Sequence, residues 1–335
     1  MDLYLDIGST NMKWQFGDGE IGHRPFVKNK PEAAPYCEID LKEILHAVYG
    51  ILAIQRFDRL FLSVQMHGYV LLDENGSELT DYISWKDRRA SLVSIPFTMH
   101  SENGVELKDN LPRAGVYAIS RLKPELYRSI REFCTFGSYL CRKLTGVNAT
   151  HITDAAPSGF FNVRTCLGRA EFVLPKACRE VVPVGYYRGA QVFTPVGDQQ
   201  AAVYGIAENK GAYILNLGTT GQMCCLCEQS CEGPFESRPF FGTGSLCTVS
   251  GLPAGEALAG NGPQDKEILQ AYRNALARLP ARRSLIVVGG AASFYRRRLQ
   301  GILSQLALPF IFSEGESALK GLKLLAKQCE EASVS

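Results

Sequence analysis

The chain has 335 residues, of which 46% are hydrophobic and 21% charged, enough for two domains with hydrophobic cores. A formal net charge of +2 predicts no nucleic-acid partner, and no apolar stretch approaches the ~20 residues that a membrane helix needs. The chain starts directly in strand-like sequence, without a basic leader and apolar signal core, so the cytoplasm is the expected compartment. The 11 cysteines are odd in number and irregularly spaced, which favours reduced thiols over a disulfide framework.

The first predicted element is a strand that ends in a tight turn. Residues 4–7 and 12–16 have strand character, and Gly8, Ser9 and Thr10 form the turn between them. Because glycine has no Cβ, its N–H can approach a phosphate oxygen closely, and the two hydroxyls add donors. The turn is therefore either an ordinary hairpin turn or one side of a phosphate site.

The rest of the first half alternates helices and strands. Asp40 can cap a helix over residues 41–52, whose apolar side chains follow helical spacing, and residues 60–64 read as a strand. A further helix is expected over residues 124–144. Alternating strands and helices imply crossover units and a layered α/β sheet.

Asp198 follows two helix-breaking residues, Pro195 and Gly197, where a helix running to Ala207 would begin. Aspartate is among the best N-cap residues, so a capping role is the simplest interpretation. A carboxylate here could also receive the proton of an attacking hydroxyl during phosphoryl transfer. Both roles are compatible with each other.

The second half repeats the first motif. Residues 214–217 read as an apolar strand, Gly218, Thr219 and Thr220 as a turn, and residues 222–227 as the returning strand. Turn chemistry alone gives no reason for two matching turns at equivalent points of two half-chains. The duplication therefore favours two turns that bind one polyphosphate from opposite sides.

Four cysteines cluster directly after this second turn: Cys224, Cys225, Cys227 and Cys231. Zinc sites usually pair cysteines at C-x2-4-C spacing in a loop, whereas Cys225 and Cys227 alternate along a predicted strand, and no histidine is near. Small buried hydrophobes are the favoured interpretation, and metal binding is the minor alternative.

The remaining elements continue the alternation. A helix, a strand, a helix, a strand and a helix are expected over residues 265–279, 285–288, 292–306, 309–312 and 317–328. Between Cys224 and Ser284 there is room for about one hairpin and one helix. The chain is predicted to divide near Gly205.

Seven motifs, in this order, resemble those of the FGGY carbohydrate kinases. They are Asp6-Ile7-Gly8-Ser9-Thr10 with Lys13, Gln65-Met66-His67-Gly68, Trp85-Lys86-Asp87-Arg88, Leu144-Thr145-Gly146, Gly197-Asp198-Gln199-Gln200-Ala201-Ala202, Leu217-Gly218-Thr219-Thr220-Gly221 and Val288-Gly289-Gly290-Ala291-Ala292-Ser293. The resemblance implies an α/β fold of two ribonuclease H-like domains, of the actin, hexokinase and Hsp70 ATPase type, flanking an ATP cleft. Residues 1–205 would hold the sugar site and first phosphate turn, and residues 206–335 a shortened nucleotide domain.

The resemblance also implies ATP and Mg²⁺ as cofactors and assigns site residues. Asp198 resembles the catalytic base, and Asp6 and Asp198 would hold Mg²⁺ through water. The implied nucleotide contacts are Asp6, Gly8, Ser9, Thr10, Lys13, Gly218, Thr219, Thr220, Gly289, Gly290, Ala291 and Ser293. The implied contacts to a small-molecule sugar substrate are Gln65, Met66, His67, Trp85, Asp87, Arg88 and Asp198.

The form of the second motif implies the substrate. Gln65-Met66-His67-Gly68 resembles xylulokinases and sedoheptulokinases, whereas glycerol kinases carry an Arg-Glu pair there, so a ketose phosphorylated on a terminal hydroxyl is expected. Alternatives stay open: His67 satisfied within its own turn, Trp85 in the core, and Asp87 with Arg88 as a surface ion pair.

Departures from the family pattern leave alternatives to this function. The stretch from Cys224 to Ser284 is short for the family and puts nucleotide affinity in question. A sugar- or nucleotide-binding regulator without turnover, and a kinase for glycerol or another polyol, are therefore the alternative functions. Oligomeric state has no signal in the sequence, and a homodimer is left open.

Overall fold

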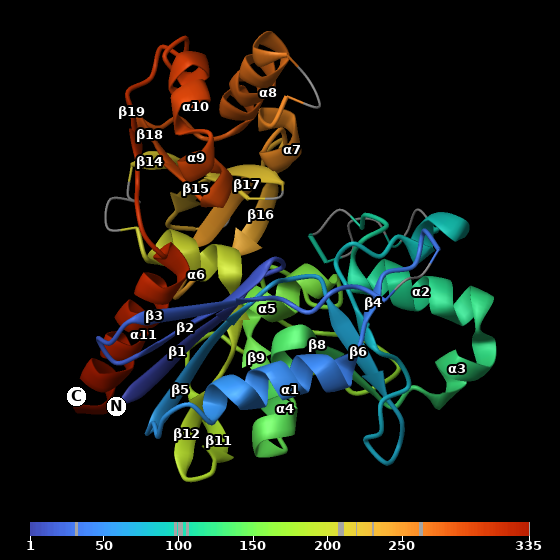
Figure 1. Cartoon of the computed structure of the whole chain (residues 1–335). Coiled ribbons are helices and arrows are strands. Elements are labelled where there is room, and N and C mark those ends of the chain that lie inside the picture. The colour runs from blue at the N-terminus through green and yellow to red at the C-terminus, as the bar shows by residue number, and fades with distance from the viewer. Residues whose placement is uncertain are drawn as a thin grey trace. The chain divides into compact units, whose positions relative to one another are not determined.

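The computed structural model describes residues 1–30, 33–96, 99, 103–104, 107–206, 211–218, 220–229, 231–260 and 264–334 (Figure 1). The chain divides into two compact units. Unit 1 holds residues 1–205 and 318–335, and unit 2 holds residues 206–317. The division after Gly205 coincides with the predicted boundary, whereas residues 318–335, expected in the second domain, pack with unit 1.

The main sheet of unit 1 has the strand order β11-β12-β5-β1-β2-β3, and β13 also pairs with β5. The bounds are β1 (Asp2–Ile7), β2 (Asn11–Phe16), β3 (Ile21–Pro25), β5 (Arg59–Val64), β11 (Pro183–Tyr187), β12 (Ala190–Phe193) and β13 (Val196–Gly197). Strands β1, β2 and β3 are antiparallel, whereas β5 is parallel to β1, β12 and β13. The carboxyl ends of β1, β5 and β13 therefore meet at one edge of the sheet.

Helix α1 (Leu41–Leu52) begins as the sequence predicts, because Oδ1 of Asp40 accepts hydrogen bonds from the backbone N–H groups of Lys42 and Glu43. Its apolar stripe, which includes Ile44 and Val48, is buried in the same core as the inward side chains of β1 and β5. Each such aliphatic side chain stabilises the fold by roughly 1.5–3 kcal/mol.

A second sheet of unit 1 has the order β4-β7-β6-β8, and two further strands, β9 and β10, form a pair. The bounds are β4 (Glu38–Ile39), β6 (Tyr69–Leu72), β7 (Tyr82–Ile83), β8 (Glu132–Thr135), β9 (Ala149–His151) and β10 (Lys176–Cys178). The other described helices of the first 205 residues are η1 (Arg89–Leu92), α2 (Pro112–Leu122), α3 (Pro124–Ser129), α4 (Phe136–Thr145), α5 (Ile152–Ala155), η3 (Ala156–Ser158) and α6 (Asp198–Tyr204).

The single helix expected over residues 124–144 is wrong. α3 ends at Ser129, β8 follows, and α4 begins at Phe136. Strand β8 forms because its backbone pairs antiparallel with β6 and buries Phe133 completely, and Thr135 then caps α4 by accepting a hydrogen bond from the N–H of Ser138. Tertiary pairing thus overrides the helical spacing of the apolar residues.

The sheet of unit 2 has the order β16-β17-β15-β14-β18-β19. The bounds are β14 (Ala212–Leu217), β15 (Gly221–Cys227), β16 (Glu236–Pro239), β17 (Ser245–Leu252), β18 (Ser284–Val288) and β19 (Phe310–Phe312). The order β17-β15-β14-β18-β19 repeats β3-β2-β1-β5-β12 of unit 1, with the same antiparallel and parallel pairings. The sequence repeat is therefore a repeat of the fold, and the predicted pair of ribonuclease H-like units is confirmed.

The described helices of unit 2 are α7 (Gly255–Leu258), α8 (Asp265–Arg278), α9 (Gly290–Phe294) and α10 (Arg296–Leu303). The helix expected over residues 292–306 divides at Tyr295 into α9 and α10. The stretch from Cys224 to Ser284 holds the expected hairpin, β16 with β17, and the expected helix, α8, together with the short helix α7.

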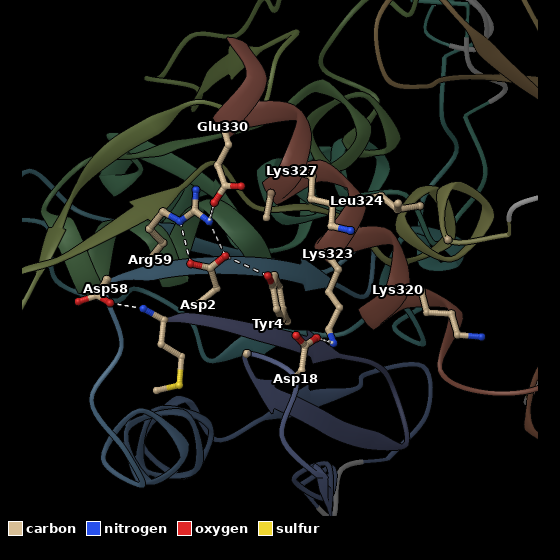
Figure 2. Close-up of a pocket in the computed structure, with 14 residues that line it drawn as sticks. Asp2, Tyr4, Asp18, Asp58, Arg59, Lys320, Lys323, Leu324, Lys327 and Glu330 are labelled. Carbon is tan, nitrogen blue, oxygen red and sulfur yellow. Dashed lines mark hydrogen bonds and ion pairs between the residues drawn. The ribbon is translucent and has the colours of Figure 1, made fainter. Parts of the chain in front are cut away.

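Helix α11 (Ser317–Val334) returns the chain to unit 1 and packs beside the first residues of β1 and β5 (Figure 2). Nζ of Lys323 contacts Oδ1 of Asp18 at 2.9 Å, and Nη2 of Arg59 contacts Oε1 of Glu330 at 2.5 Å. A Cβ added at Gly321 would overlap the carbonyl oxygen of Ala201, so glycine allows α11 to approach α6 this closely.

A cavity of about 750 Å³ lies between α11 and the amino-terminal ends of β1 and β5. Its charged groups are largely paired with one another, as the contacts of Lys323 and Arg59 show in Figure 2. Within the part of the chain that the structure describes, no helix is long and apolar enough to span a bilayer.

Candidate active site

Three segments that are far apart in the sequence meet at the carboxyl ends of β1, β5 and β13. The register places Ile7 beside Val64 and Val64 beside Gly197, and the N–H of Gln65 donates a 2.8 Å hydrogen bond to the carbonyl of Ile7. Residues that directly follow these strands therefore share one edge, as in the ligand sites of other α/β sheets. This edge brings together the first turn, the Gln65 segment and Asp198.

Asp6 lies at the end of β1, only 8% exposed, and accepts a 2.7 Å hydrogen bond from Oγ of Ser63. Lys13 and Ser63 are its register partners on the two neighbouring strands, and side chains of register partners lie on the same face of a sheet. The carboxylate is thus held in one orientation beside the first turn.

The first turn is a hairpin closed by backbone hydrogen bonds. The N–H of Gly8 donates to the carbonyl of Asn11 at 3.0 Å, and the carbonyl of Thr10 accepts from Phe26 at 2.8 Å. Ser9 is half-buried and Thr10 is exposed. Hydroxyls and a glycine N–H at the end of a strand are a suitable donor set for phosphate oxygens.

The Gln65-Met66-His67 segment is packed tightly against neighbouring elements. Gln65 is buried, and its Nε2 has no hydrogen-bond partner among the residues that the structure describes. The sulfur of Met66 lies against Gly197, directly before Asp198. His67 has φ +67° and its Nδ1 lies 3.0 Å from the carbonyl oxygen of Pro157, so its contact is outside its own turn.

The positive φ of His67 marks backbone strain of the kind that concentrates at functional sites, since residues with a side chain rarely adopt it. The next residue is closely packed. A Cβ at Gly68 would overlap the ring and hydroxyl of Tyr82, so glycine allows these two segments to approach each other.

Asp198 is the first residue of α6 and is half-buried. The N-cap position belongs to Gly197, and Oδ1 of Asp198 accepts a 2.7 Å hydrogen bond from the N–H of Gln199. The capping role expected for Asp198 is therefore wrong, since α6 begins without a side-chain cap hydrogen bond. The carboxylate stands at the start of the helix, at the same edge as Asp6.

Two buried groups near Asp198 gave no usable signal in the sequence. Burial, followed by the charges of Asp154 and Asp198, raises the pKa of Tyr82 well above its ordinary value, so its hydroxyl keeps its proton. Asp154 is buried and accepts hydrogen bonds from Thr135 and, at 2.8 Å, from Thr150, and burial raises its pKa to about 6. A lone aspartate in an apolar segment does not reveal such an environment.

The Trp85-to-Arg88 segment follows β7 and is held by a different set of contacts from the expected one. Asp87 is 5% exposed, and its carboxylate accepts from the guanidinium of Arg89 at 2.8 and 2.9 Å and from the N–H of Cys37 at 2.7 Å. Arg88 pairs instead with Asp109 at 3.4 Å. Trp85 is partly exposed, so it is not a core residue.

In unit 2, the second turn and the glycine-rich motif contact each other. The N–H of Gly218 donates to the carbonyl of Thr220 at 3.3 Å, and Thr219 lies outside the described residues. Gly289 has φ +102° and leaves no room for a Cβ beside the carbonyl of Leu217 and Oδ1 of Asn216. Only glycine fits there.

The rest of the glycine-rich motif forms the start of α9. Gly290 and Ser293 are exposed, Ala291 is half-buried, and a Cβ at Gly290 would meet nothing within 4 Å. This open backbone lies beside the second turn, and the hydroxyls and glycine N–H groups of both motifs suit phosphate oxygens.

A sequence model of the FGGY family of carbohydrate kinases, N-terminal domain, matches residues 1–167. Human sedoheptulokinase is 22% identical over 270 residues, which are 66% of this chain and 56% of that protein. The rhamnulokinase of Halalkalibacterium halodurans is 26% identical over 104 residues, which are 29% of this chain and 22% of that protein. The chain thus spans 22% to 56% of the length of these curated relatives.

Solved structures share the fold. The ligand-bound xylulose kinase of Lactobacillus acidophilus superposes with a TM-score of 0.82 at 16% identity, covering 99% of this chain and 90% of that one. Plasmodium falciparum glycerol kinase with ADP gives 0.79 at 13% identity, covering 97% and 89%. These likenesses show the fold, and the sequence match leads to one conclusion: residues 1–167 belong to the FGGY family of carbohydrate kinases.

Proposed function

We propose that the protein is an ATP-dependent kinase that phosphorylates a terminal hydroxyl of a ketose of the xylulose or sedoheptulose type. The observation that carries the proposal is the convergence of Asp6, Gln65 and Asp198 at one edge of the unit 1 sheet. Family membership supports a carbohydrate kinase. The pattern of the Gln65 segment favours a ketose, and the likeness to human sedoheptulokinase agrees with it.

Asp198 is the proposed general base. Its carboxylate accepts the proton of the attacking sugar hydroxyl, and the bond from the N–H of Gln199 fixes one of its oxygens while this happens. Phosphoryl transfer requires little covalent chemistry from the protein. Catalysis therefore depends mainly on positioning the reacting groups and on stabilising the charge of the transferred phosphoryl group. The half-buried position of Asp198 suits this role, since the carboxylate stays accessible to a ligand.

Gln65 and Met66 are proposed to select the sugar. The buried amide of Gln65 gains a partner when a sugar hydroxyl binds, so an analogue without that hydroxyl leaves the amide unsatisfied and is rejected. Met66 offers an apolar surface next to Gly197 for the C–H groups of the sugar. The other proposed sugar contacts are His67, Trp85, Asp87 and Arg88. The carboxylate of Asp87 also accepts a hydrogen bond from Arg89.

ATP, bound with Mg²⁺, would supply the phosphoryl group and the positive charge that stabilises its transfer. The metal would be held through water by the carboxylates of Asp6 and Asp198. The proposed nucleotide contacts are Gly8, Ser9, Thr10, Lys13, Gly218, Thr219, Thr220, Gly289, Gly290, Ala291 and Ser293. Cytoplasmic location and a homodimer stay predictions from the sequence.

The test is release of ADP from Mg-ATP in the presence of xylulose, sedoheptulose, rhamnulose, gluconate and glycerol, each against a sugar-free control. We expect turnover with a ketose, and an Asp198→Asn variant that binds ATP normally but loses activity by at least about a thousandfold. Absence of sugar-dependent ADP release from every substrate would overturn the proposal.

A second candidate is a binding protein without turnover, which is favoured by the short stretch between Cys224 and Ser284. It predicts thermal stabilisation by a sugar or by ATP with no ADP formed. It also predicts that the Asp198→Asn variant and the parent chain behave alike in every assay.

A further inference from the structure

Three cysteine thiols converge in the core of unit 2. Cys225 and Cys227 lie on the same face of β15, two residues apart, and Cys247 is the register partner of Cys225 on β17. Their three sulfur atoms lie within 4.8 Å of one another, and Sγ of Cys227 is 3.2 Å from Sγ of Cys247. All three cysteines are buried, and none of them forms a disulfide bond.

A fourth thiol and a cation border this group. Cys231, in the loop after β15, is partly buried and packs against the same core, and its sulfur lies outside the group of three. Nη2 of Arg282 lies 3.4 Å from Sγ of Cys227 and donates to the carbonyl of Leu226 at 2.6 Å.

The positive group distinguishes this cluster from ordinary buried thiols. Cys224, on the opposite face of β15, is fully buried as well but lies outside this sulfur group. A thiol that only fills space needs no cation beside it, whereas a thiolate does, because a buried charge is costly unless it is paired. Arg282 therefore stands where the negative charge of a metal–thiolate group would be balanced.

We propose that Cys225, Cys227 and Cys247 form a zinc site in unit 2, with Cys231 as the fourth ligand. Thiolate sulfurs are the ligands that Zn²⁺ takes in structural sites, at about 2.3 Å, which places sulfurs of a tetrahedral site about 3.8 Å apart. All three sulfurs lie within 4.8 Å of one another, so small side-chain rotations bring them to that spacing. Each thiol loses its proton on binding, so uptake of the metal releases protons.

The site would link β15 to β17. Because β15 directly follows the second turn, the link would restrict the movement of that turn. Thr220 directly precedes β15, and Cys225 lies five residues further along, so the metal would stiffen the hairpin that carries the turn. C-x-C spacing on one strand is uncommon for zinc, so the sequence spacing does not indicate the site. The third ligand, Cys247, comes from the neighbouring strand β17.

The experiment uses the full chain, purified under reducing conditions and freed of metal with a chelator. Zn²⁺ is titrated against a chromophoric competitor, proton release is followed in weak buffer, and Co²⁺ is added separately as a spectroscopic probe. We expect one Zn²⁺ per chain, release of protons, a thiolate-to-cobalt charge-transfer band, and a higher unfolding temperature with Zn²⁺ than with Mg²⁺.

The variants separate a site from a folding defect. Cys247→Ala should weaken zinc binding about a hundredfold or more, whereas the matched Cys224→Ala, on the same strand but the other face, should bind like the parent. If the reduced parent chain takes up no Zn²⁺ at micromolar concentration, or Cys247→Ala binds as well as the parent, the proposal is wrong. A Cys227–Cys247 disulfide that forms in the presence of Zn²⁺ would also overturn it. None of these readouts depends on kinase activity.

Discussion

Oγ of Ser63 donates a 2.7 Å hydrogen bond to Oδ1 of Asp6, and these two buried residues are register partners on β5 and β1. The bond fixes the carboxylate that is proposed to hold Mg²⁺ through water. Partners of this kind orient a metal-binding group, and their loss typically costs 10- to 100-fold in metal affinity or activity.

Ser63→Ala should therefore raise the Mg²⁺ concentration needed for half-maximal activity by about tenfold and lower kcat, because Asp6 loses its orienting donor. Titrating activity against Mg²⁺ measures this. Ser91→Ala, an exposed serine of unit 1, is the control and should leave the titration unchanged. An unchanged Mg²⁺ dependence in Ser63→Ala would show that the bond does not serve the metal.

Gly321→Ala should destabilise unit 1, because the new Cβ overlaps the carbonyl oxygen of Ala201 and pushes α11 away from α6. We expect a loss of about 2 kcal/mol or more in urea unfolding, and lower activity, since α6 begins at Asp198. Gly50→Ala is the matched control. Gly50 lies in α1 with nothing within 4 Å of an added Cβ, so alanine should stabilise that helix by up to about 1 kcal/mol. Equal effects of the two substitutions would contradict this packing.

Two buried groups should give opposite pH dependences of stability. Burial lowers the pKa of His151 to about 4, so the native state favours the neutral ring, and stability is lost as pH falls from 6.5 towards 4. Burial raises the pKa of Asp154 to about 6, so the stability from its protonated form is present below pH 4 and lost as pH rises through 6. Each contribution is about 3 kcal/mol, and they oppose each other in the same interval.

Single variants expose the two contributions. Relative to the parent chain, Asp154→Asn should gain stability as pH rises from 4 to 6, and His151→Gln should lose it, each by about 3 kcal/mol. Denaturant unfolding at several pH values measures the differences. Parallel pH profiles for the two variants would show that these groups do not titrate as described.

The two glycines of the unit 2 motif should respond differently to alanine. Gly289→Ala introduces a side chain at φ +102° against the carbonyl of Leu217, so unit 2 should lose about 2 kcal/mol or more of stability. Gly290→Ala meets open space and should keep its stability while nucleotide affinity falls, because the methyl group obstructs close approach to the backbone. Calorimetric titration with ATP and urea unfolding separate the effects, and normal ATP binding by Gly290→Ala would argue against this contact.

The sequence predicts features that depend on local pattern. The first turn, the Asp40 cap and the strand over residues 60–64 follow from alternation, spacing and turn chemistry, and the structure contains each of them. Of the second turn, the structure describes Gly218 and Thr220. The proposed roles of Asp6 and Asp198 come from a resemblance, and the structure adds that the strands before them meet at one edge.

What the sequence misses depends on partners far along the chain. Residues 132–135 form a strand because β6 lies beside them. The carboxylate of Asp154 is held by hydrogen bonds from Thr135 and Thr150. Asp87 pairs with Arg89 and with the N–H of Cys37 rather than with Arg88. The sequence likewise gives no sign that Cys247 joins Cys225 and Cys227, since only the pairing of β15 with β17 brings them together.

Helix α11 belongs to unit 1 although the chain reaches it only after all of unit 2. A ribosome must therefore synthesise residues 206–317 before unit 1 receives the helix that covers α6. Until then the backbone of Ala201 lacks this neighbour, so unit 1 cannot reach its final packing before unit 2 has been synthesised.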